Sequence, residues 1–130
     1  MSTLADFLFY EEPGITLYCG DAMEILEEMP DDVVCTALLD LPYNVGKSYT
    51  SYADNMPQDM YTEWVSRILF KSSIAARENV LLFPGTKNIF GIEKIVLTAT
   101  PPWLDTRLEE RLRIIRTLGW HKKEFAGDKW

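Results

Sequence analysis

The sequence predicts an α/β fold in which helices cover a parallel sheet, with residues 1–130 forming a single domain. Two observations support this class. Runs rich in β-forming residues alternate with segments whose apolar residues recur at helical spacing, and short connections join them. Residues 33–39 are apolar nearly throughout, which is typical of a parallel strand covered on both faces.

The first elements are a strand over residues 15–19 and a helix that begins at Asp21. Asp21 with Glu24 three residues later is typical of a capping box. Apolar residues recur at helical spacing until residues 30–32, Pro-Asp-Asp, end the helix. The apolar strand over residues 33–39 follows.

A long polar loop over residues 40–56 comes next, and loops of this length are usually functional or disordered. A helix begins near Pro57, and a strand covers residues 79–83. The helix is marked by apolar residues at helical spacing, namely Met60, Tyr61, Trp64, Val65, Ile68 and Leu69. Further on, the sequence predicts a short helix near residues 89–95, a strand near 95–100 and a last amphipathic helix over 104–119.

Charge is distributed unevenly along the chain. The net charge is -7, but residues 1–60 contain 12 acidic side chains and one basic one, whereas residues 61–130 contain 8 acidic and 12 basic ones. Contacts to phosphate come from Lys and Arg. Any face that meets a polyanion is therefore expected from the second half, and net charge alone neither excludes nor supports DNA as a partner.

Composition indicates a cytoplasmic protein without a membrane segment. No apolar run approaches the roughly 18 residues that a membrane span needs. Cys19 and Cys35 both lie in apolar stretches, so we expect buried free thiols in a reducing compartment. No spacing of His, Cys and carboxylate residues indicates a metal site, and no metal is expected.

The candidate site is Asp40, Leu41, Pro42 and Tyr43, hereafter the motif 40–43, directly after the predicted buried strand. Ligands of open parallel sheets bind beyond the carboxyl ends of the strands. A carboxylate and a backbone carbonyl aimed at the two N–H groups of an aromatic amine would localise its lone pair and make it nucleophilic. The proline restricts the backbone before it, and an aromatic ring can stack on a base taken out of a duplex.

The motif 40–43 resembles the Asp-Pro-Pro-Tyr motif of the N6-adenine and N4-cytosine DNA amino-methyltransferases. Residues 44–49 and 20–26 also resemble that family, and residues 82–89 do so less specifically. The resemblance covers roughly residues 15–90, in the order of the permuted subgroup, whose glycine-rich cofactor loop lies near the end of the chain. It implies a Rossmann-like methyltransferase fold.

The resemblance also implies roles for individual residues. Asp40 and the Leu41 carbonyl would accept hydrogen bonds from the target amine, adenine N6 rather than cytosine N4, while Tyr43 stacks on the flipped base and Pro42 restrains the backbone. Asp21 and Asp40 would contact S-adenosylmethionine. Separately from the resemblance, we expect contacts to DNA from Asn44, Lys47 and Lys87.

The sequence departs from the family in two ways. Leu41 stands where the family has proline, although the backbone carbonyl still serves. The 7 glycines stand at 14, 20, 46, 85, 91, 119 and 127, too far apart to form the family's Phe-x-Gly-x-Gly cofactor loop. We therefore expect an incomplete methyltransferase domain: a fragment, a truncated product or one part of a split enzyme.

Other interpretations remain open. Asp21 is at least as well explained as a helix N-cap, and both roles are compatible. The motif 40–43 alone would read as an ordinary turn, and Tyr49 with Tyr52 is better explained by loop packing. The chain is alternatively a catalytically inactive remnant or partner subunit that binds another protein or itself. Methylation of RNA or of a protein glutamine amide uses similar chemistry.

Overall fold

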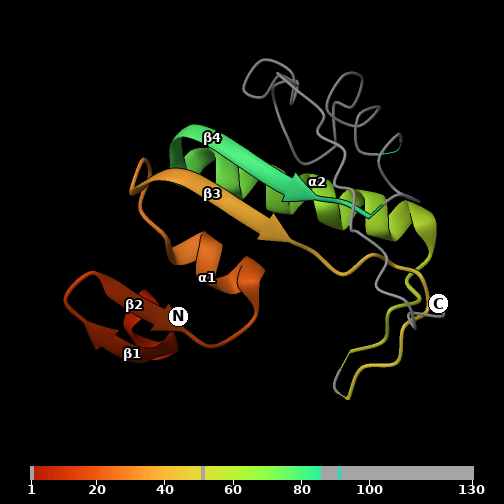
Figure 1. Ribbon diagram of the computed structural model, residues 1–130, viewed down its shortest axis with the longest axis horizontal. Helices are drawn as coiled ribbons and strands as arrows, with labels where there is room; N and C mark the ends of the chain where they lie inside the picture. The colour runs from red at the N-terminus through yellow and green to blue at the C-terminus, as the bar shows by residue number, and fades with distance from the viewer. Residues whose placement is uncertain (1, 51, 86–90, 92–130) are drawn as a thin grey trace, which may run out of the picture.

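The computed structural model describes residues 2–50, 52–85 and 91. The helices and strand predicted beyond residue 88 lie outside this part of the chain, as does Lys87. The described residues form a mixed α/β structure with two α-helices, α1 and α2, and two two-stranded sheets (Figure 1). In order, the elements are η1 (Leu4–Phe7), β1 (Leu8–Glu12), β2 (Ile15–Tyr18), α1 (Ala22–Glu28), β3 (Val34–Asp40), α2 (Gln58–Ala75) and β4 (Ala76–Phe83).

The first sheet is an antiparallel hairpin of β1 and β2, in which Tyr10 pairs with Leu17 and Glu12 with Ile15. The strand predicted over residues 15–19 is present, but strict alternation of strand and helix is wrong here, because β1 precedes it without a helix between. Pro13 and Gly14 separate the two β-rich runs, and a proline-glycine turn between such runs is a hairpin signal.

Helix α1 begins where the sequence predicts it. The side chain of Asp21 is its N-cap, and Oδ1 accepts hydrogen bonds from the backbone N–H of Met23 at 2.8 Å and of Glu24 at 3.4 Å. After the helix ends, Asp32 donates its backbone N–H to the carbonyl of Ile74 at 2.9 Å. This bond ties the start of β3 to the last turn of α2.

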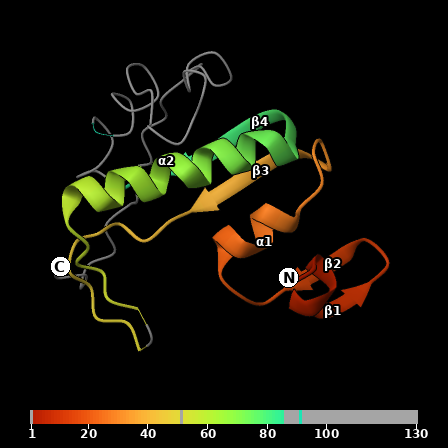
Figure 2. The ribbon, with the colours of Figure 1, turned by 180° about the vertical axis from the view of Figure 1, so that it is seen from behind.

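The second sheet is the parallel pair of β3 and β4, connected by α2. Asp40 pairs with Phe83, so the two strands end at the same edge. Figures 1 and 2 show both arrows pointing the same way, with α2 lying along one face of the pair. Helix α2 passes into β4 without a loop, which makes β4 three residues longer at its start than the predicted strand over 79–83.

The hydrophobic core lies between α2 and this face of the pair. Tyr61, Val65 and Leu69 on α2 are buried. Side chains of the strands and the following loop pack against them, among them Leu39, Leu41, Val80 and Leu82. Because side chains alternate along a strand, one face of β3 and β4 receives the helix and the other does not.

The expectation that β3 is covered on both faces is wrong for the described residues. Leu38 is 65% exposed, Leu81 51% and Phe83 44%. These three side chains form an open apolar face of the parallel pair. Both cysteines are free, as expected, but they are exposed and not buried. Cys35 accepts a hydrogen bond from Arg77 across the strand pair, with Nη2 at 2.9 Å from Sγ.

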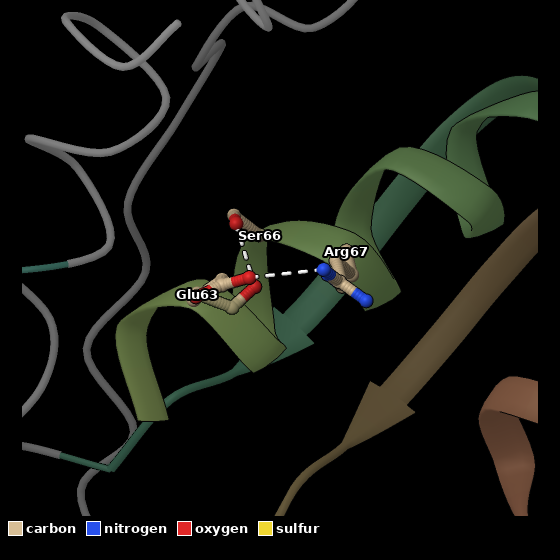
Figure 3. A network of polar contacts seen from close by, with 3 residues as sticks. All are labelled: Glu63, Ser66 and Arg67. Atoms are coloured by element: carbon tan, nitrogen blue, oxygen red, sulfur yellow. Dashed lines mark hydrogen bonds and ion pairs between the residues drawn. The ribbon is translucent and has the colours of Figure 1, made fainter. Parts of the chain in front are cut away.

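Helix α2 carries a short polar network of two exposed charged side chains and the buried Ser66. Arg67 forms an ion pair with Glu63 one turn earlier at 3.0 Å, and Ser66 donates its hydroxyl to the carbonyl of Glu63 at 2.7 Å (Figure 3). An exposed pair at this helical spacing contributes only about 0.3–0.5 kcal/mol. The apolar side of α2 therefore dominates its stability.

In the described part of the chain, no helix has the length and hydropathy needed to cross a bilayer.

The packed interface between α2 and the parallel pair and the open face of the pair predict different costs for a leucine-to-alanine substitution. Leu69→Ala, at a position that is 4% exposed, should lower the free energy of unfolding by about 2–5 kcal/mol, because it leaves a cavity under α2. Leu81→Ala on the open face is the matched control and should cost about 0.5 kcal/mol or less. Urea denaturation measures both. Equal losses would contradict this division into a packed and an open face.

Candidate functional site

The motif 40–43 lies where the parallel pair ends. Asp40 is the last residue of β3, and Leu41 begins the loop that leads to α2 at Gln58. Gly85 lies two residues after the end of β4. The strand pair therefore presents the motif 40–43 and the end of β4 at one edge, the position at which parallel sheets bind ligands.

Asp40 and Tyr43 contact each other at this edge. Both are exposed, and the Tyr43 hydroxyl donates a hydrogen bond to Oδ1 of Asp40 at 3.2 Å. Desolvation of the phenol, followed by the charge and the hydrogen bond of Asp40, raises the pKa of Tyr43 above its ordinary value of 10.0. The phenol therefore stays protonated near neutral pH and remains a hydrogen-bond donor. Asp40 is turned neither into the core nor toward a helix end.

Gly85 packs directly against the ring of Tyr43. Its φ is +66°, and a Cβ atom at this position would lie 2.9 Å from Cγ of Tyr43. The backbone after β4 thus approaches the ring as closely as only glycine permits. Sequence reasoning did not assign Gly85 a role, because this contact joins segments more than forty residues apart.

Asp54 closes the loop that follows Tyr43. Its carboxylate accepts backbone N–H groups from Asn44 at 2.8 Å and from Val45 and Lys47 at 3.0 Å each. Burial raises the pKa of this carboxyl, but the N–H groups aimed at it outweigh burial, and the pKa is lowered from 3.8. Asp54 was also missed from the sequence, since nothing in the local pattern distinguishes it from a solvated loop aspartate.

Asn44 is buried at the base of this loop. Its φ is 52°, in the left-handed region, and its side-chain N–H₂ donates to the carbonyl of Met56 at 2.8 Å. The side chain therefore helps to close the loop. A contact of Asn44 with DNA stays a prediction.

Tyr61 reaches the motif from the first turns of α2. It is 1% exposed, and its hydroxyl donates to the carbonyl of Pro42 at 2.7 Å. Burial is the main cause that raises the pKa of Tyr61 to about 12, so the hydroxyl is a donor at every physiological pH. The sequence identified Tyr61 only as an apolar position of the helix.

Lys47 lies in the exposed part of the loop, with Nζ 5.5 Å from the ring centre of Tyr49. Tyr49 meets Tyr52 edge to face, with ring centres 6.0 Å apart. This contact supports the packing interpretation of the two tyrosines. Lys87, the other predicted phosphate contact, lies outside the described residues.

A shallow depression of about 310 Å³ borders the motif on the side of α2. Its lining is polar and comes from the loop and the start of the helix, namely Asn44, Val45, Gly46, Asp54, Asn55, Met56 and Gln58. Asp40 and Tyr43 do not line it. Asp21, the other predicted cofactor contact, caps α1, whose first turn faces the carboxyl end of β3 (Figure 2).

Comparison with known proteins adds a further observation. The type II methyltransferase M.ScaI of Streptomyces caespitosus is 33% identical over 61 residues, which are 46% of this chain and 20% of that enzyme. The type II methyltransferase M.MjaVI of Methanocaldococcus jannaschii is 27% identical over 105 residues, which are 78% of this chain and 53% of that enzyme. The chain is distantly similar to type II DNA methyltransferases.

The similarity covers different shares of this chain and of each relative. The chain spans about half the length of M.MjaVI and a fifth of M.ScaI. The 105 matched residues exceed the range 15–90 that carries the motifs, so the similarity is not confined to them. No profile of a known protein family matches the chain, and no solved structure is significantly similar to it.

The contact between Gly85 and Tyr43 predicts a specific substitution effect. Gly46→Ala, where φ is +78° and a Cβ would meet nothing within 4 Å, should cost about 1–2 kcal/mol from backbone strain alone. Gly85→Ala has similar strain and in addition overlaps Tyr43, which should add about 1–3 kcal/mol. Urea denaturation of the two variants measures the difference. Equal losses would show that Tyr43 does not rest on Gly85.

Proposed function

We propose that this chain is the catalytic half of an S-adenosylmethionine-dependent enzyme that methylates the exocyclic amine of a DNA base, adenine N6 in preference to cytosine N4. The observation that carries the proposal is the exposed Asp40 at the carboxyl end of a parallel strand, hydrogen-bonded to Tyr43 of the same motif. The distant similarity to type II DNA methyltransferases supports the same reaction class. The domain, 1–130, would be a partial Rossmann-like methyltransferase domain working in the cytoplasm.

In this proposal, Asp40 and the carbonyl of Leu41 accept the two N–H groups of the target amine. An amine attached to an aromatic ring is a poor nucleophile, because its lone pair is delocalised. Two acceptors placed in advance stabilise the tetrahedral nitrogen that develops during attack, and such preorganised dipoles are a large term in catalysis. Tyr43 then holds the extruded base by stacking.

The fit of the described residues to S-adenosylmethionine is partial. The cofactor supplies the methyl group when it is bound, and its ammonium and hydroxyl groups need acceptors. Asp40 is exposed and suitable, whereas Oδ1 of Asp21 already caps α1. The glycine-rich turn of the resembling family is missing from the sequence. Asp21 and Asp40 therefore account for only part of a cofactor site.

DNA is the proposed substrate, with Lys47 and Lys87 as phosphate contacts and Asn44 beside them. Lys47 is exposed on the loop that leaves the motif. RNA and a protein glutamine amide are substrates of related chemistry, and they are the comparison substrates in a methylation assay.

Methyl transfer from labelled cofactor to DNA tests the role of Asp40. Asp40→Ala should lower kcat by about a hundredfold or more, with little change in the KM for DNA, because the lost interaction forms mainly in the transition state. Asp31→Ala is the matched control, since Asp31 is exposed in the turn before β3, at the opposite end of the strand. If both variants retain the activity of the unaltered chain, Asp40 has no part in the mechanism.

A second candidate function is a catalytically inactive remnant or the partner subunit of a split enzyme, acting through protein–protein contact. Two observations favour it. The sequence has no glycine-rich loop, and Leu38, Leu81 and Phe83 form an open apolar face on the parallel pair. Apolar faces of this kind mark contact surfaces or association-prone surfaces.

Calorimetry and light scattering separate the two candidates. Micromolar binding of S-adenosylmethionine to the chain alone would count against an inactive remnant, and binding only after addition of a second polypeptide would indicate a split enzyme. The open face should also make the chain self-associate, and Leu38→Lys should reduce this. Val45→Lys, at a position that is 56% exposed but off this face, is the control. A monodisperse monomer would contradict the expected association.

A further inference from the structure

Tyr43 lies between two peptide groups that are each held by a buried side chain. The peptide before it has its carbonyl, that of Pro42, bonded to the Tyr61 hydroxyl at 2.7 Å. The peptide after it has its N–H, that of Asn44, bonded to Oδ1 of Asp54 at 2.8 Å. Tyr61 is 1% exposed and Asp54 2%. Neither side chain is part of the motif 40–43.

We propose that Tyr61 and Asp54 are positioning residues that fix Tyr43 and the Leu41–Pro42 backbone before a substrate base arrives. This inference rests on the proposed function, since it names the groups that aim the same site. Tyr61 acts from α2 and Asp54 from the end of the loop. Together, hereafter the brace, they connect these two segments to the motif 40–43. Neither residue needs to touch the base.

The backbone around the motif leaves few torsions for these two residues to control. The ring of Pro42 fixes its own φ and keeps Leu41 out of the helical region. With the peptide groups on both sides of Tyr43 anchored, its φ and ψ are held as well. Holding the groups in advance places them for reaction.

The two anchors are also suited chemically to a permanent role. The Tyr61 ring belongs to the buried cluster with Val65 and Leu69, and its backbone N–H is bonded to the carbonyl of Pro57 at 2.9 Å. The hydroxyl is thus carried by a ring that is fixed in the core. Asp54 accepts two further N–H groups, those of Val45 and Lys47, so that its carboxylate is held from several sides. Removing the Asp54 carboxylate would leave the buried N–H of Asn44 without this partner, and removing the Tyr61 hydroxyl would do the same to the part-buried carbonyl of Pro42.

The carbonyls of Leu41 and Pro42 have different roles in this proposal. The Tyr61 hydroxyl engages the Pro42 carbonyl and not the Leu41 carbonyl. The oxygen that the proposed mechanism directs at the target amine is therefore a different one from the oxygen that holds the backbone. In this arrangement one peptide oxygen anchors the motif and the preceding one acts on the substrate.

Native-state hydrogen exchange, followed by NMR, tests the brace without any need for activity. Tyr61→Phe keeps the ring in the core and removes only the hydroxyl. The Asn44 amide, whose hydrogen bond goes to Asp54 and not to Tyr61, should then exchange about tenfold faster, because the neighbouring peptide has lost one hydrogen bond. Tyr52→Phe is the matched control, because the buried Tyr52 hydroxyl has no hydrogen-bond partner within the described residues.

The amide of Leu39 in β3 distinguishes a local brace from general stability. If Tyr61 acts as a brace, Tyr61→Phe accelerates exchange at Asn44 more than at Leu39, and Tyr52→Phe leaves the ratio of the two rates unchanged. Equal acceleration at Asn44 and Leu39 would reduce Tyr61 to a structural residue and overturn the proposal. An unchanged rate at Asn44 would also overturn it.

Single-turnover methylation links the brace to the reaction. Tyr61→Phe should lower the rate about tenfold with an unchanged Kd for DNA, and Tyr52→Phe should leave both as they are. A local exchange effect with an unaltered methylation rate would overturn the positioning role. If the unaltered chain transfers no methyl group, either alone or after addition of a second polypeptide that completes the cofactor site, the proposed function fails, whereas the exchange result still decides whether the brace exists.

Discussion

The packing of α2 against one face of the β3–β4 pair is the constraint on which the rest of the structure depends. Because the strands are parallel, the chain must return along the pair before β4 begins, and α2 makes that return as a helix with one side packed on the pair. The return places the first turns of α2 beside the carboxyl end of β3. Tyr61 can then reach the carbonyl of Pro42 while its ring contributes to the core.

Three aspartates show how environment distinguishes residues of identical chemistry. Asp21 accepts the N–H groups at the start of α1, and Asp54 is buried among N–H groups of its own loop. Both carboxylates are occupied in holding the backbone. Asp40 is exposed at the sheet edge and accepts from one phenol, that of Tyr43. Of the three, Asp40 is thus the carboxylate best placed to accept a donor from another molecule.

Much of the described fold was predictable, because local signals and tertiary structure agree there. Residues 33–39 have the composition of a parallel strand and Asp21 precedes a helical pattern, while the loop begins at Leu41, one residue later than expected, because β3 extends to Asp40. The motif 40–43 was identified for the same reason. A carboxylate followed by X-Pro-aromatic at the end of such a strand is visible in the sequence, whereas its contacts are not.

What the sequence did not predict depends on contacts between distant segments. Gly85 approaches Tyr43, Asp54 meets Asn44, and Tyr61 meets Pro42 only after the chain has folded back. An apolar run also cannot specify how many of its faces will be covered, so Cys35 and Leu38 were expected to be buried and are exposed. Periodicity reports which side chains share a face. It does not report what that face meets.

The open apolar face and the motif 40–43 belong to the same strand pair. In a parallel sheet, helices cover both faces and the loops after successive strands together build the ligand site. Within the described residues, the parallel sheet consists of two strands with one covering helix. It offers one packed face and one edge of such a site, and Asp40, Tyr43 and Gly85 lie at that edge. In the proposed function this edge supplies Asp40 and the Leu41 carbonyl as acceptors, and the described residues account for only part of a cofactor site.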